Sequence, residues 1–304
     1  MLLVIARKYN DIYYAISLPE WNLHKRKLLC IISNGIDPIS FPCLNLFDEV
    51  RSYYYKDDSN LFNIIKIIYK ISKTFPQQNV KTAILSNPVL VTNQYLLKRT
   101  NPQNLILIED GSLNYGSFSP SKSKVKKLLQ TILGINQDKL FSKITTTYLF
   151  HPDKASFYFG NIRKLKLNDN IYQVPDELQF LNHKKIFVGQ PLYSYNYISI
   201  DDYIKLTNEI IKKCEIDYYL PHAFASDEEN IDCPKLSLSD HNLTLEALAS
   251  KLNLHLFSFG STVLYSCKSI NPNTISVLVK TANPNTLNYE VKFIESFCDK
   301  TIVI

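Results

Sequence analysis

The chain has 304 residues, of which 45% are apolar, and a net charge of +6. This length allows two domains of ordinary size, each with its own hydrophobic core. No apolar run approaches the roughly 18 to 20 residues that span a bilayer, and no signal peptide is recognisable at the N-terminus. We therefore expect a globular, cytoplasmic protein without a membrane-spanning segment.

Cysteine, histidine and glycine spacing excludes several classes of protein. The six cysteines form no Cys-x-x-Cys pair, and no two of the six histidines lie within four residues of each other, so the spacing typical of a metal site is absent. We expect reduced, buried thiols and no bound metal. The seven glycines form neither a dinucleotide-binding fingerprint nor a P-loop, which argues against an NAD-dependent enzyme and an NTPase.

Charge is unevenly distributed along the chain. Residues 1–150 contain 19 Lys and Arg against 10 Asp and Glu, a net charge of +9, whereas the remainder has a net charge of −3. This asymmetry predicts that the N-terminal half faces an anionic partner, although not nucleic acid. A chance difference between the two halves is the alternative.

Short apolar runs of the first half read as buried parallel strands. They lie at 2–6, 27–33, 81–86, 105–110 and 145–150. Residues 59–73 have apolar side chains at helical spacing, which predicts a helix between the second and third strands. The alternation of strand and helix indicates βα units.

A second series of runs follows in the other half of the chain. Strands are predicted at 184–189, 216–221, 254–260, 275–279 and 301–304, with helices at 201–213, 243–252 and 286–298. Asn242 or Thr244 is a candidate cap of the middle helix. Two βα series predict an α/β protein with two Rossmann-like domains, residues 1–157 and 184–304, joined by a linker at 158–183.

In open parallel sheets ligands bind beyond the carboxyl ends of the strands, so the turns that follow the strands are the candidate sites. The first such turn is Glu109-Asp110-Gly111. A carboxylate beside a residue without a Cβ atom leaves room for a substrate hydroxyl to approach and lose its proton. A capping acid at a tight turn is the alternative interpretation.

Three further turns follow strands of the second series. Gly189-Gln190-Pro191 allows a ligand to approach the backbone closely. His222, which follows Pro221, can bind a phosphate or protonate a leaving group because imidazole titrates near neutral pH. Gly260-Ser261-Thr262 places backbone amides and two hydroxyls at a helix start, an arrangement that binds phosphate. The alternatives are an ordinary turn at Gly189-Gln190-Pro191, a histidine bonded to nearby backbone at His222, and a helix cap at Ser261 or Thr262.

The order of these motifs resembles the bacterial sialyltransferases of glycosyltransferase family 52, the lipooligosaccharide sialyltransferases, and more loosely the bacterial polysialyltransferases. The resemblance covers about residues 80–265. It implies a GT-B enzyme whose N-terminal domain binds the acceptor and whose C-terminal domain binds a CMP-sugar. The implied reaction transfers sialic acid from CMP-sialic acid to a terminal galactose, with inversion, alpha-2,3 linkage and no metal or other cofactor.

The resemblance assigns roles to individual residues. Glu109 and Asp110 match the two acids of the family's acidic-acidic-glycine motif, and Asp110 is the expected base. His222 matches the histidine of the family's His-Pro motif. Ser261 and Thr262 match a hydroxyl pair that binds the donor phosphate, while the Gly-Gln-Pro-Leu segment lies on the nucleotide side.

The chain departs from the family pattern in three places. Ala223 and Phe224 replace the usual Pro-Arg after His222. Family members carry an acid soon after the Gly-Gln-Pro-Leu segment, whereas this chain has none until Asp201 and Asp202, which makes Asp201 the alternative base. The segment Arg-Lys-Tyr-Asn-Asp stands where the family has Thr-Pro-Leu after the first strand.

Residues 121–134 indicate a further partner. Four lysines alternate there with five aliphatic residues in a basic amphipathic helix. It is predicted either to rest on an anionic surface at the inner face of the membrane, or to pack its apolar side on the core.

A homodimer is compatible with the resemblance. Another nucleotide-sugar donor, or a degenerate binding role in surface-polysaccharide assembly, are the alternative functions.

Overall fold

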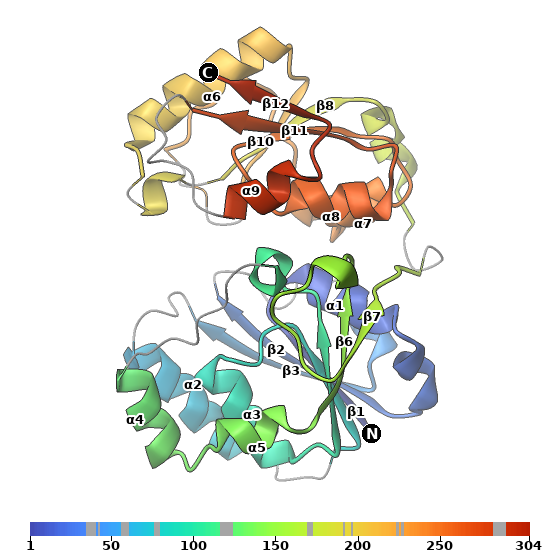
Figure 1. Ribbon diagram of the computed structural model, residues 1–304, viewed down its shortest axis with the longest axis vertical. Helices are drawn as coiled ribbons and strands as arrows, with labels where there is room; N and C mark the ends of the chain where they lie inside the picture. The colour runs from blue at the N-terminus through green and yellow to red at the C-terminus, as the bar shows by residue number, and fades with distance from the viewer. Residues whose placement is uncertain are drawn as a thin grey trace. The chain divides into compact units, whose positions relative to one another are not determined.

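The computed structural model describes residues 1–34, 41, 43–55, 61–75, 80–115, 124–168, 173–190, 192–195, 197–222, 225, 228–281 and 290–304. The chain divides into two compact units, Met1–Asn168 and Asp169–Ile304. Each unit is built on its own parallel β-sheet (Figure 1). The predicted α/β class with two Rossmann-like domains is confirmed.

The first unit contains a seven-stranded sheet in the order β3-β2-β1-β4-β5-β6-β7. Its strands are β1 (Leu2–Ala6), β2 (Lys27–Asn34), β3 (Glu49–Tyr55), β4 (Thr82–Leu85), β5 (Asn104–Ile108), β6 (Ile144–Leu149) and β7 (Asn161–Lys164). The five predicted strands are confirmed. β3 and β7 were not predicted because both lie at sheet edges with few buried side chains, and so lack the continuous apolar run of an interior strand.

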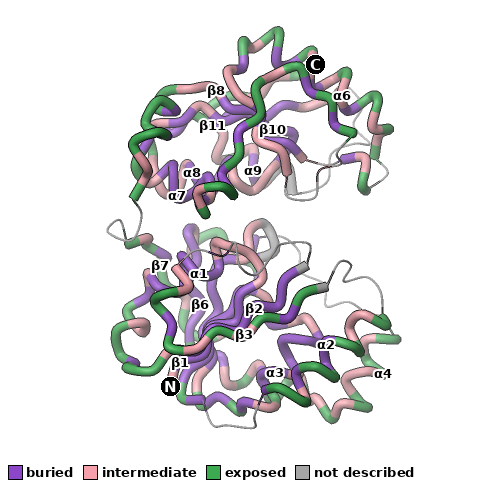
Figure 2. Tube along the Cα trace, turned by 180° about the vertical axis from the view of Figure 1, so that it is seen from behind, coloured by how far each residue is buried: buried purple, intermediate pink, exposed green. Residues whose placement is uncertain are grey.

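Helices cover both faces of the first sheet. They are α1 (Tyr9–Ile16), α2 (Leu61–Thr74), α3 (Val91–Thr100), α4 (Lys124–Ile132) and α5 (Gln137–Phe141). Alternate strand residues such as Leu3 and Ile5 pack with Ile71 of α2 and Leu97 of α3 in one core cluster. Helix α1 contacts β1, β4 and β5 instead, and the strands are the most deeply buried part of the unit (Figure 2).

The second unit contains a five-stranded sheet in the order β12-β11-β10-β8-β9. Its elements are β8 (Lys185–Val188), α6 (Ile200–Cys214), β9 (Tyr218–Leu220), α7 (Leu245–Ala249), β10 (His255–Ser258), α8 (Val263–Ile270), β11 (Ile275–Lys280), α9 (Glu290–Glu295) and β12 (Lys300–Val303). All five predicted strands are found. The cap of α7 is Thr244, whose side chain accepts a hydrogen bond from the Ala247 N–H.

The predicted linker segment 158–183 contains regular elements at both of its ends. Residues 161–164 form β7, which pairs with β6 in the first sheet. Residues 176–181 form a 3-10 helix of the second unit and bury Leu178 and Leu181. The boundary between the two units, at residues 168 and 169, lies within the predicted linker segment. An edge strand held by backbone bonds leaves little hydrophobic pattern, which is why the segment reads as irregular.

Short 3-10 helices connect several strands and helices. They are Pro19–Leu23, Leu44–Leu46, Gly111–Asn114, Pro152–Lys154, Asp176–Leu181, Leu192–Tyr195 and Ser239–His241. All six cysteines are free thiols, but only Cys30 and Cys267 are buried, so the prediction of buried thiols holds for these two. In the described part of the chain, no helix is both long enough and apolar enough to cross a membrane.

Candidate active site

The carboxyl end of the first sheet gathers polar residues from neighbouring strands. β1 pairs with β4 and β4 pairs with β5, all in parallel, so the segments that follow these three strands meet at one edge. Lys8 follows β1, Asn87 follows β4 and Asp110 follows β5. This edge is the candidate functional site of the first unit.

Asp110 is held by side chains from two other strands. Lys8 Nζ lies 3.0 Å from Asp110 Oδ1, and Asn87 Nδ2 donates to Asp110 Oδ2 at 2.9 Å. Gly111, with φ +70°, starts the 3-10 turn after Asp110. With 15% of its side chain exposed, the carboxylate is both oriented and reachable, as a general base requires.

Glu109 lies in the interior and not at the surface. Only 1% of the residue is exposed, and its Oε2 accepts hydrogen bonds from Tyr115 Oη at 2.5 Å and from the Phe150 N–H at 2.9 Å. Burial, followed by the charge of Glu109, raises the pKa of Tyr115. The predicted substrate contact of Glu109 stays a prediction; in the structure the side chain joins the end of β6 to the turn that carries Asp110.

Asp11 is a second buried acid of this edge, and the sequence motifs did not indicate it. It is fully buried, and its Oδ2 accepts the Arg7 and Lys8 N–H groups at 2.7 and 3.2 Å. Burial raises the pKa of Asp11, Lys8 opposes this, and the Asp110 carboxylate adds to it. The sequence signal that could have indicated Asp11 is an acid in the first turn of α1. Through its bonds to the Arg7 and Lys8 N–H groups, Asp11 fixes the backbone that carries Lys8.

Three predicted motifs come together at the carboxyl end of the second sheet. β10 pairs with β8 and β8 pairs with β9, all in parallel. The turns after them contain Gly260 to Thr262, Gly189 to Gln190, and His222. Pro191, Ala223 and Phe224 lie outside the described residues.

Gly189 and Gln190 form a closely packed turn. A Cβ atom at Gly189 would lie 2.4 Å from Tyr219 Oη, so only glycine fits there. The Gln190 N–H donates to Tyr203 Oη at 3.1 Å. Gln190 Oε1 is buried and has no hydrogen-bond partner among the described residues, which leaves it as an acceptor for a ligand.

A buried tyrosine and glutamate network supports this turn. Glu229, 2% exposed, accepts from Tyr219 Oη and Tyr193 Oη, each at 2.7 Å. Tyr203 Oη lies 3.2 Å from Tyr219 Oη. Burial raises the pKa of Tyr219 and Tyr203, so both stay protonated as donors. The members of the network are spread over residues 193–229, so no local sequence pattern indicated it.

His222 stands at the end of β9 after Pro221. Burial lowers the pKa of His222 below 6.5, and the charge of Glu229 partly opposes this shift. The imidazole is therefore largely neutral at neutral pH. It can gain a proton when an anionic ligand arrives, because a nearby negative charge favours the protonated form.

The Gly260-Ser261-Thr262 turn leads into α8. Gly260 has φ +130°, a region that favours glycine. Thr262 is the N-cap residue, and its side chain makes no capping hydrogen bond. The Ser261 N–H donates to Ser258 Oγ at 3.3 Å, and Ser258 Oγ donates to the Val188 carbonyl at 2.8 Å. These bonds tie the turn to β8.

Asp201, the alternative base, lies in the first turn of α6 and is exposed. The cap of this helix uses its neighbour, because Ser199 Oγ accepts the Asp202 N–H at 3.1 Å and donates to Asp202 Oδ2 at 2.7 Å. Asp201 is thus accessible, but within the described residues no side-chain hydrogen bond orients it as Lys8 and Asn87 orient Asp110. Across the described ranges, no group of three or more His, Cys, Asp or Glu side chains is placed to hold a metal ion.

Two Rossmann-like units, each with candidate ligand-binding turns at the carboxyl end of a parallel sheet, define the GT-B glycosyltransferase fold. The spinosyn forosaminyltransferase SpnP aligns with a TM-score of 0.52 and 9% identity over 100% of this chain and 85% of that one. SnogD, a glycosyltransferase from Streptomyces nogalater, aligns with a TM-score of 0.48 and 9% identity over 99% of this chain and 86% of that one. The E. coli heptosyltransferase WaaC with ADP aligns with a TM-score of 0.45 and 7% identity over 99% of this chain and 92% of that one.

The family follows from the sequence. The model of glycosyltransferase family 52 matches residues 47–282, and the chain belongs to this family. The match includes all the candidate turns described above, from Asp110 to Thr262. A search of curated proteins gives no significant match. The chain is therefore a GT-B glycosyltransferase of family 52.

Proposed function

We propose that this glycosyltransferase moves sialic acid from CMP-sialic acid to a terminal galactose of a lipooligosaccharide or capsular glycan, with inversion and an alpha-2,3 linkage. Membership of family 52 supports the reaction class. The observation that carries the proposal is the oriented, accessible carboxylate of Asp110, held between Lys8 and Asn87 at the carboxyl end of the first sheet. In this proposal residues 1–157 provide the acceptor side and residues 184–304 the donor side.

On the acceptor side, Asp110 removes the proton of the attacking galactose hydroxyl. The new bond forms between that oxygen and the anomeric carbon of sialic acid, while the bond from this carbon to the CMP phosphate breaks. The transition state has oxocarbenium character, with negative charge growing on the leaving phosphate. A base positioned in this way contributes about 10² to 10⁴-fold to the rate.

On the donor side, three turns receive CMP. Amide and hydroxyl groups at Ser261 and Thr262 bind the phosphate. His222, neutral in the free protein, takes up a proton as the phosphate charge develops. Gly189 and Gln190 lie beside these groups on the central strand of the three, and the unpartnered Gln190 Oε1 is an acceptor suited to a nucleotide N–H or hydroxyl. This donor site needs no other cofactor.

A donor screen tests the proposed reaction. Purified protein is incubated with CMP-sialic acid, other CMP-sugars and UDP-sugars, with and without lactose as the galactose-terminated acceptor. We expect release of CMP only from CMP-sialic acid, stimulated by lactose, and a sialylated product in mass spectrometry. If only a UDP-sugar is turned over, the donor is a UDP-sugar and not CMP-sialic acid. If no donor is hydrolysed, the protein is a catalytically degenerate binding protein of polysaccharide assembly.

A variant pair decides between the two candidate bases. Asp110→Asn is expected to lose transfer by about 10² to 10⁴-fold, while Asp201→Asn keeps wild-type turnover. CMP binding, measured by calorimetry, should be unchanged in both variants. The reverse pattern of turnover would assign the base to Asp201.

We also propose that the first unit rests on an anionic membrane surface. Helix α4 exposes Val125, Leu128 and Ile132 to 52%, 61% and 70%, and α2 exposes Ile65 and Tyr69 to 47% and 60%. Both helices pack against α3 and lie on the same side of the unit (Figures 1 and 2).

Charge favours a lipid surface as the partner of these two helices. α2 and α4 contain six lysines and no acid: Lys66, Lys70, Lys73, Lys124, Lys126 and Lys127. Exposed apolar side chains among lysines are typical of helices that bind anionic lipid. Residues 121–123 of the predicted segment lie outside the described residues.

Vesicle co-sedimentation tests the membrane proposal. We expect binding to vesicles that contain phosphatidylglycerol, and loss of binding in the double variant Leu128→Glu/Ile132→Glu. Val303→Glu, at an exposed valine of the second unit, is the matched control. Equal sedimentation with neutral and anionic vesicles would contradict the proposal.

A further inference from the structure

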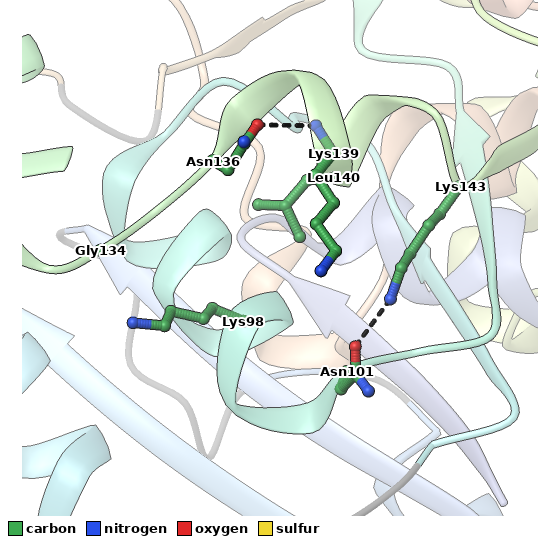
Figure 3. Close-up of a pocket in the computed structure, with 7 residues that line it drawn as sticks. All are labelled: Lys98, Asn101, Gly134, Asn136, Lys139, Leu140 and Lys143. Atoms are coloured by element: carbon green, nitrogen blue, oxygen red, sulfur yellow. Dashed lines mark hydrogen bonds between the residues drawn. The ribbon is translucent and has the colours of Figure 1, made fainter. Parts of the chain in front are cut away.

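The first unit contains a polar cavity that lies away from Asp110. It has a volume of about 390 Å³ and lies at the amino end of the sheet, since Lys143 directly precedes β6 and Asn101 lies shortly before β5. Asp110 follows the carboxyl end of β5, at the opposite edge. We call this cavity the lysine pocket, and it is lined by Lys98, Asn101, Gly134, Asn136, Lys139, Leu140 and Lys143 (Figure 3).

The lining of the lysine pocket is positively charged. Three of its seven residues are lysines and none is an acid. The remaining polar side chains are two asparagines whose Oδ1 atoms already accept bonds, Asn101 from Lys143 Nζ at 2.7 Å and Asn136 from the Lys139 N–H at 2.9 Å. The pocket therefore offers mainly hydrogen-bond donors, and it suits a ligand rich in acceptors.

Two of the three ammonium groups are fixed by neutral oxygens. Lys98 Nζ donates to the Leu133 carbonyl at 2.6 Å, and Lys143 Nζ donates to Asn101 Oδ1 and to the Pro102 carbonyl at 3.0 Å. These bonds orient the lysines without cancelling their charge. Burial, and then the charge of Lys139, lower the pKa of Lys143, which agrees with an uncompensated cluster of cations.

Lys139 is the third cation, and its ammonium group has no hydrogen bond or ion pair within the described residues. Its side chain extends from α5 toward α3 (Figure 3). Gly134 keeps the facing wall open: it has φ +58°, and a Cβ atom there would lie 2.9 Å from Lys98 Nζ. A larger residue would displace that amine or fill the pocket.

We propose that the lysine pocket binds the phosphate group of a phosphorylated ligand through Lys98, Lys139 and Lys143. Phosphate is an acceptor-only group with up to two negative charges, and lysine is a common binder of it. A pocket of this size belongs to the range of small-molecule sites, about 300 to 1,000 Å³, so it accommodates a pyrophosphate or a phosphomonoester with part of its organic group. Neither the transfer reaction nor CMP binding requires this site.

The phosphate has two chemical sources, a soluble phosphorylated metabolite or the headgroup of a phospholipid such as phosphatidic acid. Pyrophosphate represents the first source in the experiment. Vesicles of phosphatidylcholine with phosphatidic acid, compared with phosphatidylglycerol at the same mole fraction, represent the second. Saturating CMP is present throughout, so that the proposed donor site cannot account for binding.

Lys139→Gln is the decisive variant, because the Lys139 ammonium makes no described contact that folding depends on. Pyrophosphate affinity by calorimetry is expected to fall by at least about tenfold, the effect of one charge-assisted hydrogen bond, and to fall further in Lys139→Glu. Lys251→Gln, at an exposed lysine of the second unit, is the control and should match wild type. Acetylation of Lys139 with mass-spectrometric detection should be slowed by pyrophosphate, while that of Lys251 should not.

Each result assigns or overturns the site. If pyrophosphate binds in a Lys139-dependent manner, the source is soluble. If only phosphatidic acid vesicles respond to Lys139→Gln, the source is a lipid headgroup. Unchanged binding of both probes in Lys139→Gln and Lys139→Glu, or no binding of either probe to the wild type, would overturn the proposal.

Discussion

Lys8 Nζ lies 3.0 Å from Asp110 Oδ1 and so links the end of β1 to the end of β5 across the intervening strand β4. Asn87, which follows β4, binds the other oxygen of the same carboxylate. Three neighbouring strands therefore determine where this acid points. The Lys8 side chain is 40% exposed, so the pair is screened by water and acts more on orientation than on stability.

The first prediction concerns Lys8 as a positioning residue. Lys8→Met should lower kcat by about tenfold or more, because a base that loses its fixed orientation reacts less often in the productive geometry. KM for CMP-sialic acid, the proposed donor, should stay unchanged, since Lys8 belongs to the unit proposed to bind the acceptor. Lys8→Arg restores a cation and should recover part of the rate. A loss confined to KM for the donor would argue against this role.

The second prediction concerns Glu109. Glu109→Gln replaces a buried carboxylate that accepts two hydrogen bonds by an amide with weaker acceptor strength. We expect the free energy of unfolding to fall by about 1 to 3 kcal/mol, measured by urea denaturation. Tyr115→Phe, which removes one donor, should cost less than Glu109→Gln. Full stability in both variants would show that the two bonds do not hold the turn.

The third prediction concerns the contact between Gly189 and Tyr219. Gly189→Ala places a methyl group 2.4 Å from Tyr219 Oη, so Tyr219 must move and its bond to Glu229 weakens. We expect a loss of about 1 to 3 kcal/mol in unfolding free energy together with weaker CMP binding. Tyr219→Phe removes the oxygen that the new methyl group would contact. Tyr219→Phe should therefore lower the unfolding free energy less in the Gly189→Ala variant than in the wild type.

The fourth prediction is a pH dependence that arises from His222. Burial lowers the pKa of His222 in the folded protein from 6.5, so below that value the unfolded chain binds more protons than the folded one. Stability should therefore fall as the pH drops through and below about 6.5. His24, His151 and His255 are shifted in the same direction, so the contribution of His222 is the difference between wild type and His222→Gln in denaturation across this range.

The same histidine predicts a proton linked to donor binding. If His222 gains a proton beside the CMP phosphate, CMP affinity should rise as the pH falls from about 8 toward 6.5. Calorimetry in buffers of different ionisation enthalpy measures the protons taken up. His222→Gln should bind CMP with little pH dependence over this range. Equal proton uptake in wild type and variant would assign the effect to another group.

The hydrophobic pattern determined most of the fold. Interior strands such as β1 and β5 contain continuous apolar runs, and such runs are visible in the sequence. The edge strands β3 and β7 escaped prediction because they bury few side chains and are held by backbone hydrogen bonds, which side-chain identity does not encode. The same reason explains why the predicted linker includes β7.

For the candidate site, the sequence alone placed Asp110, His222, Gly189 and the Ser261-Thr262 pair at strand ends, because each lies just after an apolar run. Only the tertiary structure decided which of two adjacent acids faces solvent: Asp110 is held at the edge, while Glu109 turns inward to Tyr115. Only the tertiary structure also revealed the roles of Lys8 and Asp11 and the presence of the lysine pocket. Their partners lie far apart in sequence, and long-range contacts arise from sheet order and helix packing, which no local pattern of residues specifies.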